Sequence, residues 1–194
     1  MLEAIKSFDE NLFLFFNGLH SPIVDSVMWL FSDKFFWVPL YIWFLWILYK
    51  RYPKNYWTVL IAVVLMIVAS DQLCNIFKDS VLRLRPSNDP HLRLLVHVLK
   101  DYNGNEYRGG SYSFYSGHAS NAFAVAIFMI TTLSGKIKYL IPVSLTYAIL
   151  TAYSRVYLGV HYPGDILVGA IMGSMLGIGF AVVHEKMRSN LKMR

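Results

Sequence analysis

Three short polar segments interrupt an otherwise apolar chain, and each carries side chains that could take part in chemistry. The first runs from Lys78 to Arg85-Pro86 and follows a long apolar run. The second is Ser116-Gly117-His118, which directly precedes another such run. The third lies between two further runs and contains Ser154, Arg155, His161 and Asp165. Ionisable groups beside long apolar helices cost free energy, so they are candidates for function by default.

The three segments hold more cations than acids. Lys78, Arg85 and Arg155 have no matching set of carboxylates in the same motifs. Arginine binds phosphate oxygens through a fork of N–H donors, and lysine acts as a point charge. Ser116 and Gly117 precede an expected helix, so their backbone N–H groups could also bind an anion. These residues predict a site for a phosphoryl group, whose transition-state charge the cations would stabilise.

Two histidines and one aspartate could carry out the transfer of that group. Near neutral pH, neutral imidazole can act as a nucleophile and imidazolium as a proton donor. We expect His161 to attack phosphorus and His118 to protonate the leaving oxygen as a general acid. Asp165 follows His161 by four residues, and we expect it to accept the other ring N–H of His161. Pro163 and Gly164 fit the intervening turn, and proline also suits the start of the next helix.

A metal site is the alternative use of the same side chains. His118, His161 and Asp165 could form a two-histidine, one-carboxylate set of ligands. The three nearby cations would repel a metal ion and already supply the charge that it would bring. We therefore expect no metal and no other cofactor.

Five apolar runs surround the polar segments, namely residues 35–49, 56–77, 119–133, 139–152 and 166–183. A helix needs about 20 apolar residues to cross a bilayer, with about 17 as the lower limit. The second and fifth runs meet this limit, and the others need flanking residues or local thinning of the bilayer. Only 15% of the chain is charged, against about 25% in soluble domains. We expect an all-α, polytopic transmembrane helical bundle, with residues 1–194 as a single domain.

Basic residues between the runs predict how the bundle is oriented. Clusters at 50–54, 135–138 and 186–194 would be cytoplasmic by the positive-inside rule. The catalytic motifs, within residues 78–165, would then lie on the outer side, with an outer catalytic loop after the second run. We expect an inner (plasma) membrane protein whose active site faces the periplasm or exterior. Residues 1–34 are either an interfacial segment or contain one short span, so we expect five or six spans.

The outer loop itself carries further cations, which oppose this charge rule. Arg83, Arg93, Lys100 and Arg108 accompany Arg85 there. Their presence is accounted for if some of them bind phosphate.

A polar stripe lies on the second apolar run. Asp71, Asn75 and Lys78 share one face of the expected helix, and Asp71 would lie about 10 Å below Lys78. We expect Asp71 and Asn75 to support Lys78, with a local hydrogen bond to Asp71 as an equal alternative.

The last run carries a stripe of small residues, Gly169, Gly173 and Gly177, at four-residue spacing. Such a stripe lets two helices approach closely. We favour packing within the bundle over dimerisation, and both a monomer and a homodimer stay open.

Taken together, the motifs resemble the signature of the type 2 phosphatidic acid phosphatase family. Lys78 to Pro86 matches the pattern of a lysine, six residues and Arg-Pro. Residues 115–118 match Pro-Ser-Gly-His, except that Tyr115 replaces the proline. Residues 154–165 match Ser-Arg, five residues, His, three residues and Asp. The resemblance implies metal-independent hydrolysis by His161 and His118, with the phosphate held by Lys78, Arg85, Ser116, Gly117, His118 and Arg155.

The substrate is less closely defined by the sequence. Like bacterial members of the family, the chain is short, and undecaprenyl diphosphate, cleaved to undecaprenyl phosphate, is the leading expectation. Lipid A phosphate and phosphatidylglycerol phosphate are alternatives. A non-catalytic phosphate-binding protein or transporter is less favoured, because it would not need the two histidines. The expected partners are a lipid phosphate and the bilayer. Nucleic acid is not expected, because the basic residues form short clusters between apolar runs.

Overall fold

The computed structural model describes residues 2–101, 103–133 and 137–192. Within them it contains seven α-helices, one short 3-10 helix and no β-strand beyond isolated bridges, which confirms the all-α class. The helices are α1 (Leu2–Gly18), α2 (Pro22–Ser32), α3 (Val38–Arg51), α4 (Tyr56–Val81), η1 (Pro86–Asn88), α5 (Gly117–Leu133), α6 (Leu140–Tyr157) and α7 (Pro163–Lys192).

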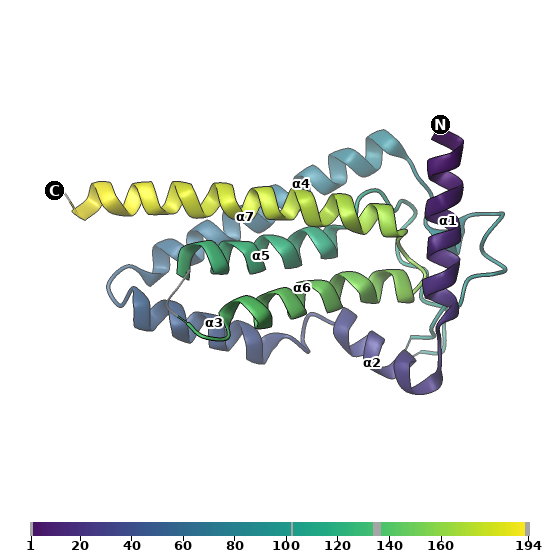
Figure 1. Cartoon of the computed structure of the whole chain (residues 1–194), viewed down its shortest axis with the longest axis horizontal. Helices are drawn as coiled ribbons and strands as arrows, with labels where there is room; N and C mark the ends of the chain where they lie inside the picture. Colours follow the sequence, from purple (N-terminus) through teal and green to yellow (C-terminus); the bar gives the residue numbers. More distant parts are fainter. Residues whose placement is uncertain (1, 102, 134–136, 193–194) are drawn as a thin grey trace.

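The five apolar runs correspond to α3–α7, which lie alongside one another along the long axis of the molecule (Figure 1). Helix α1 lies across one end of this bundle, beside the long α4–α5 connection. This crosswise placement agrees with the interfacial alternative for the N-terminal segment. The helices extend past the predicted runs, because α4 continues through Lys78 to Val81 and α7 already begins at Pro163. Pro163 thus occupies the first helical position, as predicted.

The glycine stripe of α7 packs against α5. A Cβ added to Gly169 would lie 2.6 Å from the carbonyl oxygen of Ser116, and one added to Gly177 would lie 2.7 Å from that of Ala124. Gly173 faces the Ser120 carbonyl in the same way. Real Cβ atoms do not approach carbonyl oxygens this closely, so glycine is required at these positions. Packing of the stripe within the bundle is therefore confirmed.

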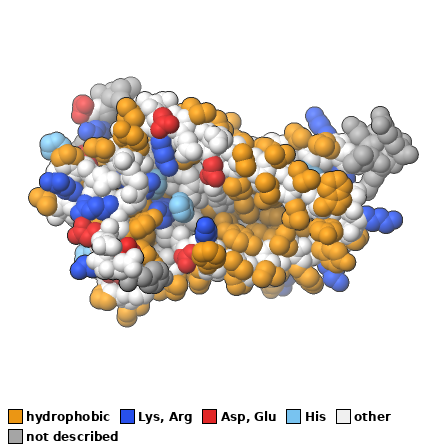
Figure 2. Space-filling model, turned by 180° about the vertical axis from the view of Figure 1, so that it is seen from behind, with side chains coloured by type: hydrophobic (Ala, Val, Ile, Leu, Met, Phe, Trp, Pro, Cys, Tyr) orange, Lys and Arg blue, Asp and Glu red, His pale blue; other side chains and the backbone are white. Residues whose placement is uncertain are grey.

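The outer surface of the bundle is apolar between two charged ends. Helices α4 and α7 are long and apolar enough to cross a membrane, with mean hydropathies of 2.1 and 2.3 over their apolar windows. Figure 2 shows a band of hydrophobic side chains between two ends that carry charged groups. A band of this kind on a helical bundle indicates a membrane location. Of the predicted cytoplasmic basic clusters, Gly135, Lys136, Arg194 and the Lys192 side chain lie outside the described part of the structure.

Candidate active site

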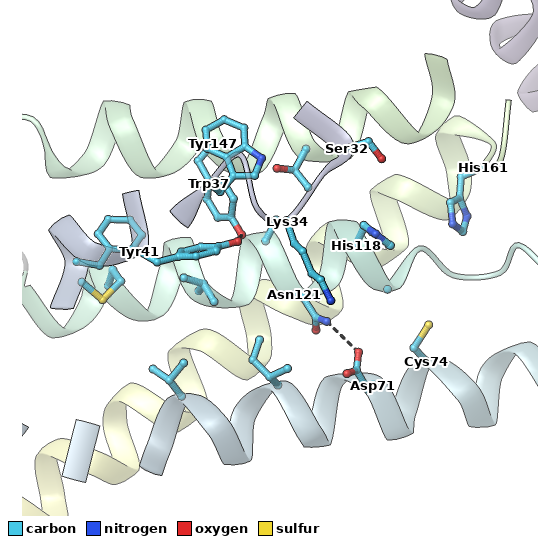
Figure 3. A pocket seen from close by; sticks show the side chains of 18 of the residues that line it. Ser32, Lys34, Trp37, Tyr41, Asp71, Cys74, His118, Asn121, Tyr147 and His161 are labelled. Carbon is cyan, nitrogen blue, oxygen red and sulfur yellow. Dashed lines mark hydrogen bonds between the residues drawn. The ribbon is translucent and has the colours of Figure 1, made fainter. Parts of the chain in front are cut away.

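A cavity of about 720 Å³ runs between α3, α4, α5 and α6. Its polar end contains residues from all three predicted motifs, of which Figure 3 shows His118 and His161. The cavity then continues between apolar side chains such as Phe44, Leu48 and Val63. The predicted site residues that line it are Lys78, Arg85, Gly117, His118 and His161. Three segments that are distant in sequence thus converge on one polar cavity with an apolar extension.

His161 lies in the short connection between α6 and α7 and is 1% exposed. Its Nδ1 atom is 3.5 Å from Oδ2 of Asp165, which is too long for a well-formed hydrogen bond, and this nitrogen has no other hydrogen-bond partner. Burial lowers the pKa of His161 to about 4, against the opposing effect of Asp165. The ring is therefore neutral at physiological pH, as a nucleophilic imidazole must be.

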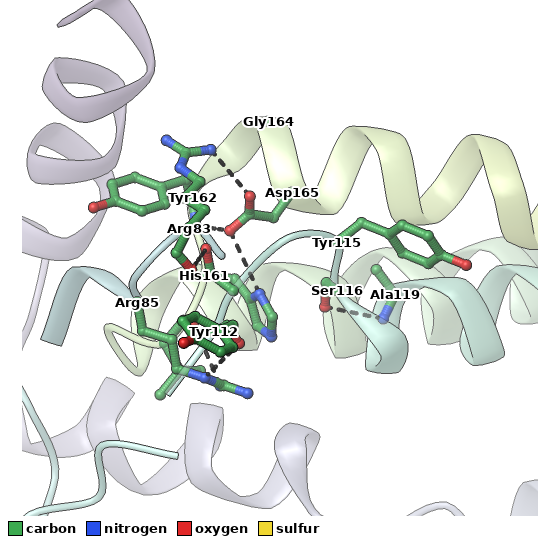
Figure 4. A network of polar contacts seen from close by, with 12 residues as sticks. Arg83, Arg85, Tyr112, Tyr115, Ser116, Ala119, His161, Tyr162, Gly164 and Asp165 are labelled. Atoms are coloured by element: carbon green, nitrogen blue, oxygen red, sulfur yellow. Dashed lines mark hydrogen bonds and ion pairs between the residues drawn. The ribbon is translucent and has the colours of Figure 1, made fainter. Parts of the chain in front are cut away.

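Asp165 is completely buried and held from two sides (Figure 4). Its Oδ2 accepts the backbone N–H of Tyr162 at 2.9 Å. This bond caps α7, because a side chain in the first turn accepts the N–H of the residue that precedes the helix. Its Oδ1 accepts a hydrogen bond from Nη1 of Arg83 at 3.0 Å. The carboxylate is thus fixed beside His161 by partners other than His161 itself.

Arg83 connects this carboxylate to the N-terminal helix. Its Nη2 donates to Oδ2 of Asp9 at 2.8 Å, and its guanidinium lies over the ring of Tyr162, 3.6 Å from the centroid. Asp9 also accepts the backbone N–H of Gly164 at 2.7 Å through Oδ1. No role was predicted for Asp9, and Arg83 was expected only as one of the loop cations of which some would bind phosphate. The one signal available was the unexplained surplus of arginines in the outer loop.

The second motif forms the start of α5. The hydroxyl of Ser116 accepts the backbone N–H of Ala119 at 3.4 Å and so caps the helix. The backbone N–H of Ser116 donates to the carbonyl oxygen of Asp165 at 3.1 Å. This N–H thus joins the start of α5 to the start of α7, and the binding of phosphate by Ser116 stays a prediction. Gly117 and His118 follow in the first turn and line the cavity.

Arg85 reaches the cavity from the outer loop and is 8% exposed. Its Nε donates to the Tyr112 carbonyl at 3.2 Å and its Nη1 to the Val160 carbonyl at 3.4 Å. Burial, and after it the charge of Arg155, lowers the pKa of Arg85. The guanidinium groups of Arg85 and Arg155 thus repel each other in a buried region. A bound anion would reduce this repulsion.

Arg155 lies near the C-terminal end of α6 and is 2% exposed. Its Nη2 donates to the Tyr107 hydroxyl at 2.8 Å, and its Nη1 donates to the hydroxyl of Ser32. Its Nε is buried without a partner. An unpaired N–H of a buried cation is costly, and Arg155 is not among the residues that line the cavity. Ser32 and Tyr107 lie outside the three motifs, and the sequence did not indicate either of them.

The polar stripe on α4 forms part of the cavity wall. Asp71, Asn75 and Lys78 all face the cavity. Among the described residues, Asp71 accepts its hydrogen bond from Asn121 on α5, at 2.8 Å, and not from Lys78. A hydrogen bond to Asp71 was one of the two alternatives, and the support of Lys78 by Asp71 and Asn75 stays a prediction.

Tyr115 replaces the proline of the motif and is completely buried. Its ring lies 5.5 Å from that of Phe77, between ring centroids, and its carbonyl accepts the Cys74 thiol at 3.3 Å. Packing of the Tyr115 ring thus holds the loop before α5 in place. In the family motif, a proline would restrict the backbone at this position. The departure from the family motif is accommodated without displacing His118 from the cavity.

Comparison with known proteins identifies the class to which this bundle and cavity belong. A sequence model of the PAP2 superfamily matches residues 59–189. The chain is 39% identical to a lipid A 4'-phosphatase of Bacteroides thetaiotaomicron, over 99% of this chain and 84% of the relative. It is 28% identical to an undecaprenyl-diphosphatase of Sulfolobus acidocaldarius, over 87% of this chain and 75% of that protein.

Solved structures give the same result. The crystal structure of a transmembrane PAP2 type phosphatidylglycerolphosphate phosphatase from Bacillus subtilis matches with a TM-score of 0.70 at 25% identity. The match covers 94% of this chain and 87% of that one. The fold is that of a membrane helical phosphatase, and the chain belongs to the PAP2 superfamily. It is accordingly a phosphoric monoester hydrolase, as the motifs predicted.

Proposed function

We propose that this protein removes a phosphate group from lipid A or a closely similar phosphorylated glycolipid. The observation that carries the proposal is the likeness to a lipid A 4'-phosphatase along almost the entire chain. The likeness to an undecaprenyl-diphosphatase is weaker and covers less of the chain. Undecaprenyl diphosphate, the leading expectation from the motifs, therefore becomes the second candidate. The apolar extension of the cavity suits the acyl or prenyl chains of either lipid.

In the proposed reaction, the phosphate enters the polar end of the cavity. Lys78, Arg85 and Arg155 balance its charge, and the N-terminus of α5 adds its helix dipole. The ring nitrogen of His161 that does not face Asp165 attacks phosphorus, so that an N–P bond forms and the P–O bond to the lipid breaks. The leaving oxygen takes the proton of His118.

The second half of the reaction restores both histidines. Neutral His118 takes a proton from a water molecule whose oxygen attacks phosphorus, and the N–P bond breaks. Inorganic phosphate leaves, His161 is neutral and His118 is protonated again. Asp165 stabilises the positive phosphohistidine between the two steps, in the way that a buried carboxylate stabilises imidazolium.

In the proposed membrane arrangement, α3–α7 cross the bilayer and α1 lies along its outer surface. The polar end of the cavity then faces the periplasm or exterior, opposite the basic cluster around Lys50 and Arg51. The headgroup would be processed at the outer leaflet of the inner membrane, with the apolar part of the cavity level with the acyl chains.

The substrate is tested by phosphate release from lipid A, undecaprenyl diphosphate and phosphatidylglycerol phosphate with purified full-length protein. We expect the highest kcat/KM with lipid A and the loss of one phosphate in the mass spectrum of the product. If undecaprenyl diphosphate were hydrolysed and lipid A were not, the proposed substrate would be wrong.

The pH dependence of catalysis follows from the lowered pKa of His161, because the nucleophile must be neutral. The neutral form persists down to about pH 4, so kcat/KM should fall on the acid side near pH 4 and not near the ordinary histidine value of about 6.5. The substrate phosphate itself titrates near pH 6. Profiles of kcat/KM against pH, measured with substrates whose phosphates differ in pKa, separate the ionisation of His161 from that of the substrate. An acid limb near 6.5 that is the same for all substrates would contradict the assignment.

Replacing Arg83 tests whether it positions Asp165. In Arg83→Gln the buried carboxylate loses a charged donor, and we expect kcat to fall about 10- to 100-fold with little change in KM. The charge of Asp165 is then less neutralised, so it favours imidazolium and the acid limb should move to higher pH. Arg83→Lys should restore little, because lysine lacks the planar fork that holds both carboxylates while it lies over the Tyr162 ring.

The exposed Arg93 in the same loop supplies the control, Arg93→Gln, which should behave as wild type. A loss of activity in Arg83→Gln without any shift of the pH profile would indicate a purely structural role for Arg83.

A further inference from the structure

A polar pair lies in the cavity wall away from the reacting residues. Asp71 on α4 accepts a hydrogen bond from Nδ2 of Asn121 on α5, at 2.8 Å (Figure 3). Both side chains line the same cavity as His118 and His161. Their neighbours farther along the wall are apolar, among them Ile67, Val125 and Met129. The pair thus lies between the polar end of the cavity, where the phosphate would bind, and its apolar end.

The pair has hydrogen-bonding capacity left over, most of it in acceptors. Because a carboxylate only accepts, the amide group of Asn121 that faces Asp71 must be its NH₂. The Oδ1 atom of Asn121 is left buried without a hydrogen-bond partner. An aspartate in the middle of a membrane-length helix is also costly, which argues for a functional reason to keep it. The unsatisfied groups call for a ligand that brings hydroxyl or amide N–H donors.

The position of the pair fits the part of a substrate next to its phosphate. Asn121 follows His118 by three residues on α5, which is about 4.5 Å along the helix axis. Asp71 precedes Lys78 by seven residues on α4, or about 10 Å. A sugar ring whose phosphate reaches Lys78 and His118 would lie beside Asp71 and Asn121. Lys34, from the connection between α2 and α3, extends toward the same region (Figure 3) and could donate to carbonyl oxygens of the ligand.

We propose that Asp71 and Asn121 form a headgroup subsite that accepts hydrogen bonds from hydroxyl or amide N–H groups of a phosphorylated sugar. The inference rests on the proposed function and explains how the site would select a glycolipid phosphate. A prenyl diphosphate carries no such donors beyond its phosphates. Its chain would leave the remaining acceptor atoms of Asp71 and Asn121 without donors, and a site built for hydrogen bonds rejects an analogue that lacks them.

The test compares two substrates in one protein. In Asp71→Asn, the NH₂ group replaces an acceptor, so we expect the ratio of kcat/KM for lipid A to that for undecaprenyl diphosphate to fall about 10-fold or more. Asn121→Leu should lower the ratio in the same direction. The control is Asp79→Asn, because Asp79 is exposed on α4 and does not line the cavity; its ratio should equal that of wild type.

The outcomes separate the subsite from the proposed function. Turnover of undecaprenyl diphosphate by each variant reports that the protein is folded and the catalytic residues are in place. An equal fall for both substrates, or no fall for lipid A, would overturn the subsite and leave the function intact. Wild-type protein that does not hydrolyse lipid A would overturn the function, and the subsite with it.

Discussion

His161→Ala is expected to abolish phosphate release from every substrate, with a fall in kcat of at least about 10⁴-fold. No other described side chain in the cavity combines a neutral imidazole with a buried carboxylate at 3.5 Å. His118 has no such carboxylate and belongs to the cation-rich side of the site. Removal of His161 should also leave substrate affinity largely intact, because the cations that hold the phosphate remain.

Steady-state phosphate release and equilibrium binding of a phosphorylated lipid measure these two effects separately. His91→Ala is a suitable control, since His91 is exposed in the outer loop and does not line the cavity. It should retain wild-type activity. Residual turnover by His161→Ala above about 1% of wild type would mean that another group can attack phosphorus.

His118→Ala is expected to show the second-largest effect, and the size of the effect should depend on the leaving group. A lipid alkoxide needs a proton as the P–O bond breaks, so kcat should fall about 10²- to 10⁴-fold with lipid substrates. A nitrophenolate leaves without a proton. With p-nitrophenyl phosphate, the loss should therefore be much smaller.

The measurement is a comparison of wild type and His118→Ala with a lipid phosphate and with p-nitrophenyl phosphate. His161→Ala serves as the reference, because loss of the nucleophile should affect both substrates alike. An equal loss of kcat for both substrates in His118→Ala would argue against proton donation and for a role in holding the phosphate.

The motifs predicted which residues meet at the polar end of the cavity, because short-range contacts within each motif determine its structure. Helix starts and tight turns fix each motif within a few residues, as Ser116 does by capping α5 and Asp165 by capping α7. Apolar runs of helical length then bring the motif ends to one side of the bundle. The convergence of Lys78, Arg85, His118 and His161 on one cavity could therefore be predicted from their residue types and motifs.

The supporting contacts could not be predicted, because they join segments that are remote in sequence. Asp9 reaches Arg83 only because α1 lies across the end of the bundle, and no periodicity in the sequence encodes that placement. Arg155 likewise donates hydrogen bonds to Ser32 and Tyr107, which are remote from it in sequence. Of the basic residues in the outer loop, Arg85 lines the cavity, whereas Arg83 binds carboxylates and Arg108 pairs with Glu106.

The identity of the substrate could not be predicted from the motifs either. Lys78, Arg85 and the histidines act on the phosphate, which every candidate lipid shares. Discrimination must come from side chains farther along the cavity, such as Asp71 and Asn121, whose pairing joins α4 to α5. A sequence pattern identifies Asp71 as unusual, but only the packing of the two helices gives it a partner.

Transfer of labelled phosphate from lipid A to the protein tests the central claim most directly. Wild-type protein is mixed in excess with ³²P-lipid A, quenched in base within a single turnover, and digested. We predict a base-stable, acid-labile label on the peptide that contains His161, and no label on His161→Ala protein. Complete release of labelled phosphate within one turnover, with none bound to the protein at any quench time, would contradict the phosphohistidine account.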